Sequence, residues 1–187
     1  MNEQSHASPP KAARQHRAES SPRKEAAEAA ERPCFIEGGA IAALVPHRGP
    51  MLWLSRILSY DIERRTLTAE YDITSQSLFN SAHGGFPAWA AFELMAQAIS
   101  ALSGLGARRE GNGPSPGFIL SVSEFEARPL FLAEGSTARI EISADAVVDR
   151  LYSFHCRVWS AGTPIARARL TVAEVDDRTI HNRLGAA

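Results

Sequence analysis

The sequence predicts an α+β domain in which an antiparallel sheet wraps round one long, buried helix. Residues 88–105 are apolar on almost every side, and the segments before and after them alternate apolar and polar residues. A helix without a polar face is buried, and alternation is typical of strands that bury one face. A sheet wrapped round a single helix buries both kinds of element together.

The central helix has a clear start and a clear stop in the sequence. Pro87 suits the first helical position, and Gly104 with the pair Arg108 and Arg109 predicts an end near residue 105. Its apolar side chains are Trp89, Phe92, Leu94, Met95, Ile99, Leu102 and Leu105.

Strands are expected on both sides of this helix. A short helix at 41–45 comes first, and the expected strands are 51–58, 66–73, 117–126, 137–148, 151–160 and 164–175. In the strand at 151–160, Tyr152, Phe154, Cys156 and Val158 share one face. The order of one short helix, two strands, one buried helix and further strands is that of the hotdog fold.

The chain divides into three parts by composition. Residues 1–32 contain no aliphatic or aromatic side chain larger than alanine, apart from Met1, so we expect a disordered tail. Residues 33–176 form the expected hotdog domain, and 177–187 a loose C-terminal tail.

Composition excludes several classes of protein. Twenty Lys and Arg against 21 Asp and Glu leave a net charge of −1, which argues against nucleic-acid binding. The two cysteines cannot make a disulfide framework, and no histidine pair has the spacing of metal ligands, so no metal or cofactor is expected. Glu93 and Gln97 interrupt the apolar helix, so we expect no membrane span. Without a signal segment, the expected location is the cytoplasm.

Three polar residues of the helix lie on one stripe, namely Glu93, Gln97 and Ser100. An ionised carboxylate is costly on an apolar helix unless it is paired, and no Lys or Arg occurs between Arg65 and Arg108. Glu93 should therefore face a polar cleft or stay protonated, and either state suits a general acid. The alternative is a glutamate bonded to backbone groups at a dimer seam.

Two histidines are candidates for a catalytic base. His47 lies in the loop Pro46-His47-Arg48-Gly49-Pro50, and His83 lies in a Gly-containing loop just before the helix. An ordinary loop histidine explains His47 about as well as a functional one and explains His83 somewhat better, so the sequence leaves both interpretations open.

These residues also carry a family resemblance, which covers about residues 35–175. Segment 45–57, with Pro-His-Arg-Gly-Pro, resembles the opening of FabZ-type 3-hydroxyacyl-[acyl-carrier-protein] dehydratases. Segment 86–97, Phe-Pro-Ala-Trp-Ala-Ala-Phe-Glu-Leu-Met-Ala-Gln, is similar to their central helix. Within that superfamily, the Pro-Ala-Trp and Met-Ala-Gln blocks, Gly-Phe-Ile-Leu-Ser at 117–121 and the last hairpin are most similar to the ApeP-like dehydratases of aryl polyene clusters.

The resemblance implies dehydration of a 3-hydroxyacyl thioester to the trans-2-enoyl thioester, in fatty acid or aryl polyene biosynthesis. It implies Glu93 as the acid, a histidine as the base, and Gln97 as the residue that orients the acid. The other expected substrate contacts are Gly85, Pro87 and Ala88 at the start of the helix, where backbone N–H groups could bind the thioester oxygen.

One position departs from the FabZ pattern. The catalytic histidine of those enzymes lies fourteen residues before the helix glutamate, and that position here is Phe79. Either His47 or His83 replaces it, with His47 slightly favoured, or the chain lacks a base and works beside a partner.

The expected partners are an acyl carrier protein and a second hotdog subunit, in a homodimer or a heterodimer. Arg48, Arg108 and Arg109 are candidate contacts for an acidic carrier. A non-catalytic subunit of a heterodimeric dehydratase and a hotdog thioesterase are the alternative functions.

Deleting the N-terminal tail should leave the melting temperature and the turnover unchanged, because the tail has too little apolar surface to contribute to a core. Thermal unfolding and an activity assay of the full and shortened chains test this. A clear drop in either value would contradict the prediction.

Overall fold

The computed structural model describes residues 32–80, 85–114 and 116–175, so residues 1–31 of the expected N-terminal tail, the expected C-terminal tail and His83 lie outside the described residues. The elements in chain order are β1 (Arg32–Glu37), α2 (Gly39–Ala42), the 3-10 turn η1 (Gly49–Met51), β2 (Arg56–Asp61), β3 (Thr66–Asp72), β4 (Gly85–Pro87), the 3-10 turn η2 (Ala88–Ala90), α3 (Ala91–Arg109), β5 (Gly117–Ala127), β6 (Phe131–Ala133), β7 (Thr137–Val148), β8 (Leu151–Ser160) and β9 (Thr163–Glu174).

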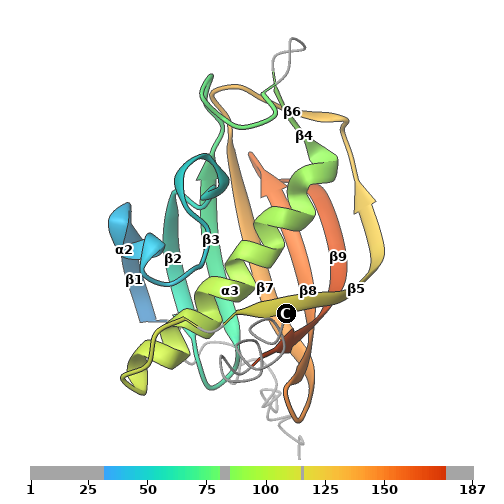
Figure 1. The fold of residues 1–187 in the computed structure, drawn as a ribbon. Coiled ribbons are helices and arrows are strands. Elements are labelled where there is room, and N and C mark those ends of the chain that lie inside the picture. Colours follow the sequence, from blue (N-terminus) through green and yellow to red (C-terminus); the bar gives the residue numbers. More distant parts are fainter. Residues whose placement is uncertain (1–31, 81–84, 115, 176–187) are drawn as a thin grey trace, which may run out of the picture. The chain divides into compact units, whose positions relative to one another are not determined.

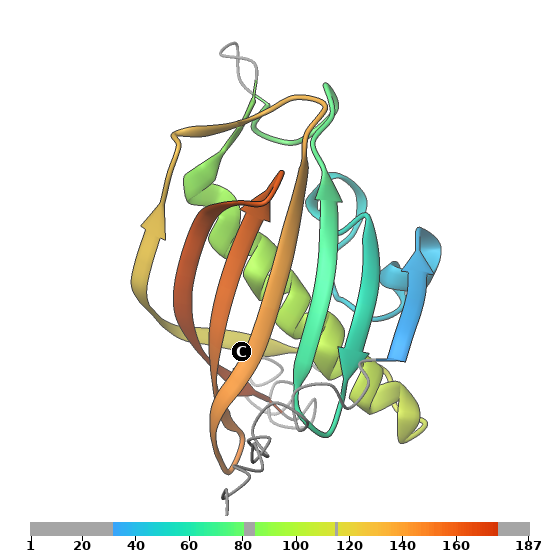
Figure 2. The same ribbon diagram turned by 180° about the vertical axis from the view of Figure 1, so that it is seen from behind.

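Seven strands form one antiparallel sheet in the order β1-β2-β3-β7-β8-β9-β5, and β4 pairs with β6 in a separate two-stranded ribbon. The helix α3 lies across one face of the large sheet (Figure 1). Seen from behind, the opposite face of the sheet carries no helix among the described residues (Figure 2). This is the predicted hotdog arrangement, with β1 and β5 at the two edges of the sheet.

The central helix is confirmed, but Pro87 ends strand β4, η2 takes up the expected first turn, and α3 begins at Ala91 and runs four residues beyond the expected end. Ten of its residues are buried, and Arg108 and Arg109 occupy its last turn, where the helix dipole favours cations. With η2 it is long and apolar enough to cross a membrane by length and composition alone, but most of it is buried inside the domain. It is therefore the core helix of this domain.

Gly104 explains why the helix does not end at its first glycine. A Cβ at this position would lie 2.0 Å from the backbone oxygen of Leu44, so only glycine lets the segment after α2 approach the helix this closely. Gly104 is thus a packing residue inside the helix, which the sequence pattern could not distinguish from a stop signal.

The strands follow the predicted alternation where one face meets α3. In β7, Ala138, Ile140 and Ile142 are buried, and in β8 Phe154 and Cys156 face the same core. The β8–β9 turn has positive φ at both Ala161 and Gly162, the combination that two-residue hairpins with the native twist require.

Several elements differ from the sequence prediction, among them the short strands β4 and β6, which were not expected. The strand β1 begins at Arg32, inside the segment assigned to the tail. The strand expected at 51–58 begins only at Arg56, because η1 and the residues after it turn towards α3. The short helix is a single turn two residues earlier than expected, at Gly39–Ala42.

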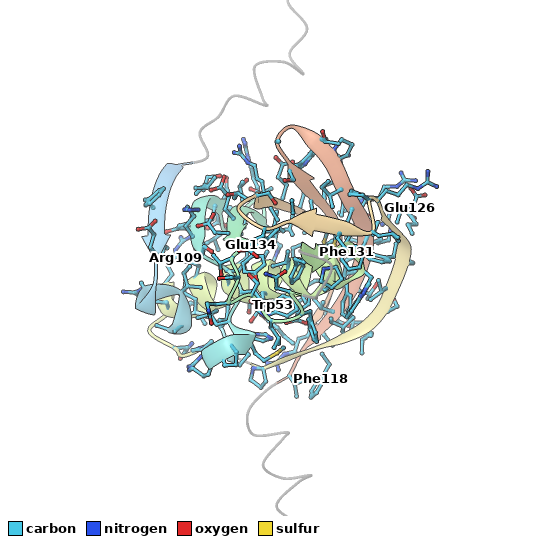
Figure 3. All side chains as sticks on the ribbon, turned by 90° about the horizontal axis from the view of Figure 1, so that it is seen from above. Trp53, Arg109, Phe118, Glu126, Phe131 and Glu134 are labelled. Carbon is cyan, nitrogen blue, oxygen red and sulfur yellow. The ribbon has the colours of Figure 1, made fainter. Side chains whose placement is uncertain are left out.

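Apolar side chains remain exposed along the edge strand β5. Phe118, Leu120 and Val122 are at least two-fifths exposed, and Trp89 at the start of the central helix is 55% exposed. The helix is therefore not covered on every side within one chain. Phe118 and Glu126 lie at the outer rim of the domain and Trp53 near its middle (Figure 3).

The two helix glycines make a matched pair for a stability test. Gly104→Ala should lower the free energy of unfolding by about 2–3 kcal/mol, because the new methyl group overlaps the Leu44 backbone. Gly106→Ala places its methyl 3.9 Å from the nearest side-chain atom, so it should be neutral or stabilise by up to about 1 kcal/mol. Urea unfolding of the two variants measures the difference, and equal effects would refute this account of Gly104.

Candidate active site

Glu93 lies in the first turn of α3, where the helix dipole favours a negative charge. Its Oε1 atom is 3.1 Å from Nε2 of His47, on the loop between α2 and η1. The two side chains are 19% and 25% exposed, respectively, so the pair is accessible at the surface of one chain. The structure thus brings together two of the three residues expected to be catalytic.

Gln97 ties this pair to the neighbouring loop. Its Nε2 donates to Glu93 Oε1 at 2.9 Å and to the Met51 carbonyl at 2.8 Å, and its Oε1 accepts the Trp53 N–H at 2.9 Å. The side chain is completely enclosed, and its hydrogen bonds go to protein groups. Gln97 therefore lies behind Glu93 as its support, while its expected contact with substrate stays untested.

The loop that carries His47 is also held by its own bonds. The Arg48 guanidinium donates to the carbonyls of Val45 and His47, and the Trp53 indole N–H donates to the Pro50 carbonyl at 3.0 Å. These bonds hold the backbone on both sides of His47.

Arg48 is thus engaged within its loop, and Arg109, another expected carrier contact, pairs with Glu63 at 2.7 Å.

A groove of about 1030 Å³ runs from this pair along α3. The helix contributes one stripe, Glu93, Ala96, Ser100, Ser103 and Ala107, which follows the three-and-four spacing of a single face. The sheet contributes Ile119, Phe154 and Val172 opposite this stripe. A groove lined by both apolar and polar side chains, with a titratable pair at one end, fits an elongated substrate.

The expected backbone contacts at the helix start are largely occupied. Gly85 and Pro87 pair with β6, and a Cβ on Gly85 would lie 2.4 Å from the Leu132 backbone oxygen. The Ala88 N–H donates to the Leu130 carbonyl at 2.9 Å. This amide hydrogen is therefore engaged within the fold, and the substrate contacts expected at Gly85, Pro87 and Ala88 stay predictions.

Phe79 packs among aromatic rings near the start of the helix. Its ring centroid lies 5.9 Å from that of Trp53 and 5.6 Å from that of Trp89, and its backbone has a positive φ of 64°. Nearly half of the side chain is exposed. An aromatic packing residue thus occupies the position of the FabZ-type histidine.

Among the described residues, no three His, Cys, Asp or Glu side chains gather as a metal site requires. Burial raises the pKa of the Cys156 thiol to about 12, with a further contribution from Asp145, so this thiol stays protonated at neutral pH.

Comparison with known proteins agrees with this architecture. The family model of the ApeP dehydratase, described as ApeP-like, matches residues 39–182. The chain belongs to the ApeP-like dehydratase family. Over 78 residues it is 36% identical to the 3-hydroxyacyl-[acyl-carrier-protein] dehydratase FabZ of Chlamydia pneumoniae, an alignment that covers 40% of this chain and 51% of the relative. The chain thus spans about half the length of that curated relative.

Solved structures share the fold, and two of them serve as examples. The dehydratase heterocomplex ApeI:P from Xenorhabdus doucetiae aligns with a TM-score of 0.70 and 21% identity, over 77% of this chain and 96% of that one. A thioesterase variant from Pseudomonas aeruginosa aligns with a TM-score of 0.50 and 21% identity, over 64% and 80% of the two chains. The fold is therefore shared by proteins named as a dehydratase and as a thioesterase.

Replacing Gln97 by Met should destabilise the domain, because it leaves the buried Trp53 N–H without its acceptor. An unsatisfied buried donor costs about 1–3 kcal/mol, and the free energy of unfolding should fall by at least that amount. Urea unfolding with tryptophan fluorescence as the signal measures the loss. Unchanged stability would mean that the Gln97 bonds contribute nothing net to the fold.

Proposed function

We propose that this chain dehydrates a 3-hydroxyacyl thioester on an acyl carrier protein to the trans-2-enoyl thioester, in fatty acid or aryl polyene biosynthesis. The observation that carries the proposal is the 3.1 Å contact between His47 and Glu93 at one end of a groove along α3. Membership of the ApeP-like family supports the reaction type.

The pair can supply both proton transfers of the reaction. His47 takes the proton from the α carbon, and the electron pair of that C–H bond becomes the new double bond. The C–O bond at the β carbon breaks with its electrons, and Glu93 protonates the leaving hydroxyl, which departs as water. A proton then passes from His47 to Glu93, and both groups return to their starting states.

The support behind the pair explains how it stays aligned. Gln97 donates to the same Glu93 oxygen that faces His47, and it also holds the loop that carries His47 through Met51 and Trp53. The start of α3 lies beside the pair, and its positive dipole end favours the negative charge that develops on the thioester oxygen.

The edge strand β5 favours a second hotdog subunit as a partner. Its exposed apolar side chains, together with the free backbone groups of an edge, form a surface that single-chain proteins normally protect. We propose that either another copy of this chain or a related hotdog subunit pairs along this edge.

Glu93→Gln and His47→Ala should each lower turnover by about 10²-fold or more, because each removes one of the two proton-transfer groups. Glu37→Gln makes the same chemical change on the edge strand β1, at an exposed side chain that does not line the groove, and should keep turnover within about twofold. The assay follows a 3-hydroxyacyl carrier substrate by mass spectrometry, with each variant tested for folding by circular dichroism.

The products of this assay separate the candidate functions. Enoyl thioester supports the proposal, and free acid would replace it by a thioesterase. Turnover that appears only after a second hotdog protein is added would indicate the non-catalytic subunit. Wild-type rates in both variants would remove the pair from the mechanism.

Val122→Arg should convert the assembled protein to monomers, because a charge placed on the apolar edge strand opposes pairing. Gln76→Arg adds the same side chain on an exposed loop and should leave the assembly intact. Light scattering coupled to size-exclusion chromatography measures the masses. A monomeric wild-type protein, with or without a co-expressed hotdog partner, would contradict the proposal.

A further inference from the structure

The groove that begins at His47 and Glu93 reaches a polar cluster further along the helix. Ser103 lies ten residues after Glu93 on the same helix face, which corresponds to about 15 Å along the helix axis. Ser103 contacts Glu174, the last residue of β9, and Tyr152, in β8, lies on the other side of Glu174.

Glu174 is the centre of this cluster. Ser103 Oγ donates to its Oε1, and the Tyr152 hydroxyl donates to its Oε2 at 3.3 Å. The Arg65 guanidinium lies over the Tyr152 ring, 4.7 Å from its centroid. Burial and the nearby Glu174 charge raise the pKa of Tyr152, so its hydroxyl remains a hydrogen-bond donor.

The groove before the cluster is lined by apolar side chains together with Ser100. Ile99, Ile119, Phe154 and Val172 line the groove together with the cluster. Each Glu174 oxygen has one of the two donors named above, and a carboxylate oxygen can accept a second hydrogen bond. An alkyl end pressed against this carboxylate would remove water without replacing its hydrogen bond, which is unfavourable.

We propose that Glu174, positioned by Ser103 and Tyr152, selects the distal end of the acyl chain by accepting a hydrogen bond from a hydroxyl group there. The inference rests on the proposed function, in which the groove holds an acyl chain whose reacting carbons lie at His47 and Glu93. The preferred substrates are then 3-hydroxyacyl thioesters that carry a hydrogen-bond donor about 15 Å from the reacting carbons. Plain alkyl chains of the same length bind more weakly.

The test measures binding, so it does not depend on turnover. The probes are unreactive alkyl thioethers of pantetheine, in a series from octyl to tetradecyl, each with and without a terminal hydroxyl. At the length that reaches Glu174, wild-type protein should bind the hydroxylated probe about tenfold more tightly, the difference expected for a hydrogen bond to a charged group. Isothermal titration calorimetry gives the dissociation constants.

Three variants show whether Glu174 causes the preference. Glu174→Met keeps the length of the side chain without its charged acceptor and should reverse the preference in favour of the plain alkyl probe. Tyr152→Phe keeps the ring over which Arg65 lies but removes the donor to Glu174, and Ser103→Ala removes the other donor. Both should reduce the preference several-fold. A butyl probe, too short to reach the cluster, should bind all four proteins equally.

Several results would overturn the inference. One is equal affinity of wild-type protein for the hydroxylated and the plain probe at every length. Another is a hydroxyl preference that survives in Glu174→Met. Failure of every probe to bind would overturn the inference as well. Turnover of a short 3-hydroxybutyryl substrate tests the dehydratase proposal separately. A hydroxyl preference without turnover would refute only the reaction, and turnover without the preference would refute only the role of Glu174.

Discussion

The burial of one apolar helix is the constraint on which the rest of the structure depends. The sheet covers one side of α3, and the segment between α2 and β2 closes over another. Two contacts allow this closure. Gly104 lets the Leu44 backbone touch the helix, and the enclosed Gln97 amide replaces water for the backbone of Met51 and Trp53. Without the Gly104 contact, part of the helix surface would lose its packing. Without the Gln97 amide, buried backbone groups of Met51 and Trp53 would lose their hydrogen bonds.

The same closure creates the candidate site. The segment that seals the helix carries His47, and Gln97 bonds both to this segment and to Glu93. The carboxylate that is costly on an apolar helix is therefore compensated by an imidazole and an amide rather than by a Lys or Arg. Stability of the fold and alignment of the proton-transfer pair thus depend on one hydrogen-bonded unit.

The sequence predicted the helices and strands better than the contacts between them. Apolar patterning was sufficient for α3 and for the buried faces of β7 and β8, because burial imposes a period on each element. It could not show that His47 meets Glu93, 46 positions later, or that Ser103, Tyr152 and Glu174 meet in one groove. Those contacts depend on how the sheet and loop are placed round the helix. Gly104 was interpreted as a helix stop for the same reason, because its role depends on the close approach of the Leu44 backbone, which the sequence does not show.

The central claim is that His47 and Glu93 act as one unit, and a double-mutant cycle tests it most directly. Single-turnover dehydration rates would be compared for wild-type protein, His47→Ala, Glu93→Gln and the double variant. If a proton passes between the two side chains, either substitution already disables the unit, and the double variant should be no slower than the slower single variant. Losses that multiply in the double variant would show that the two residues act independently, and would contradict the account.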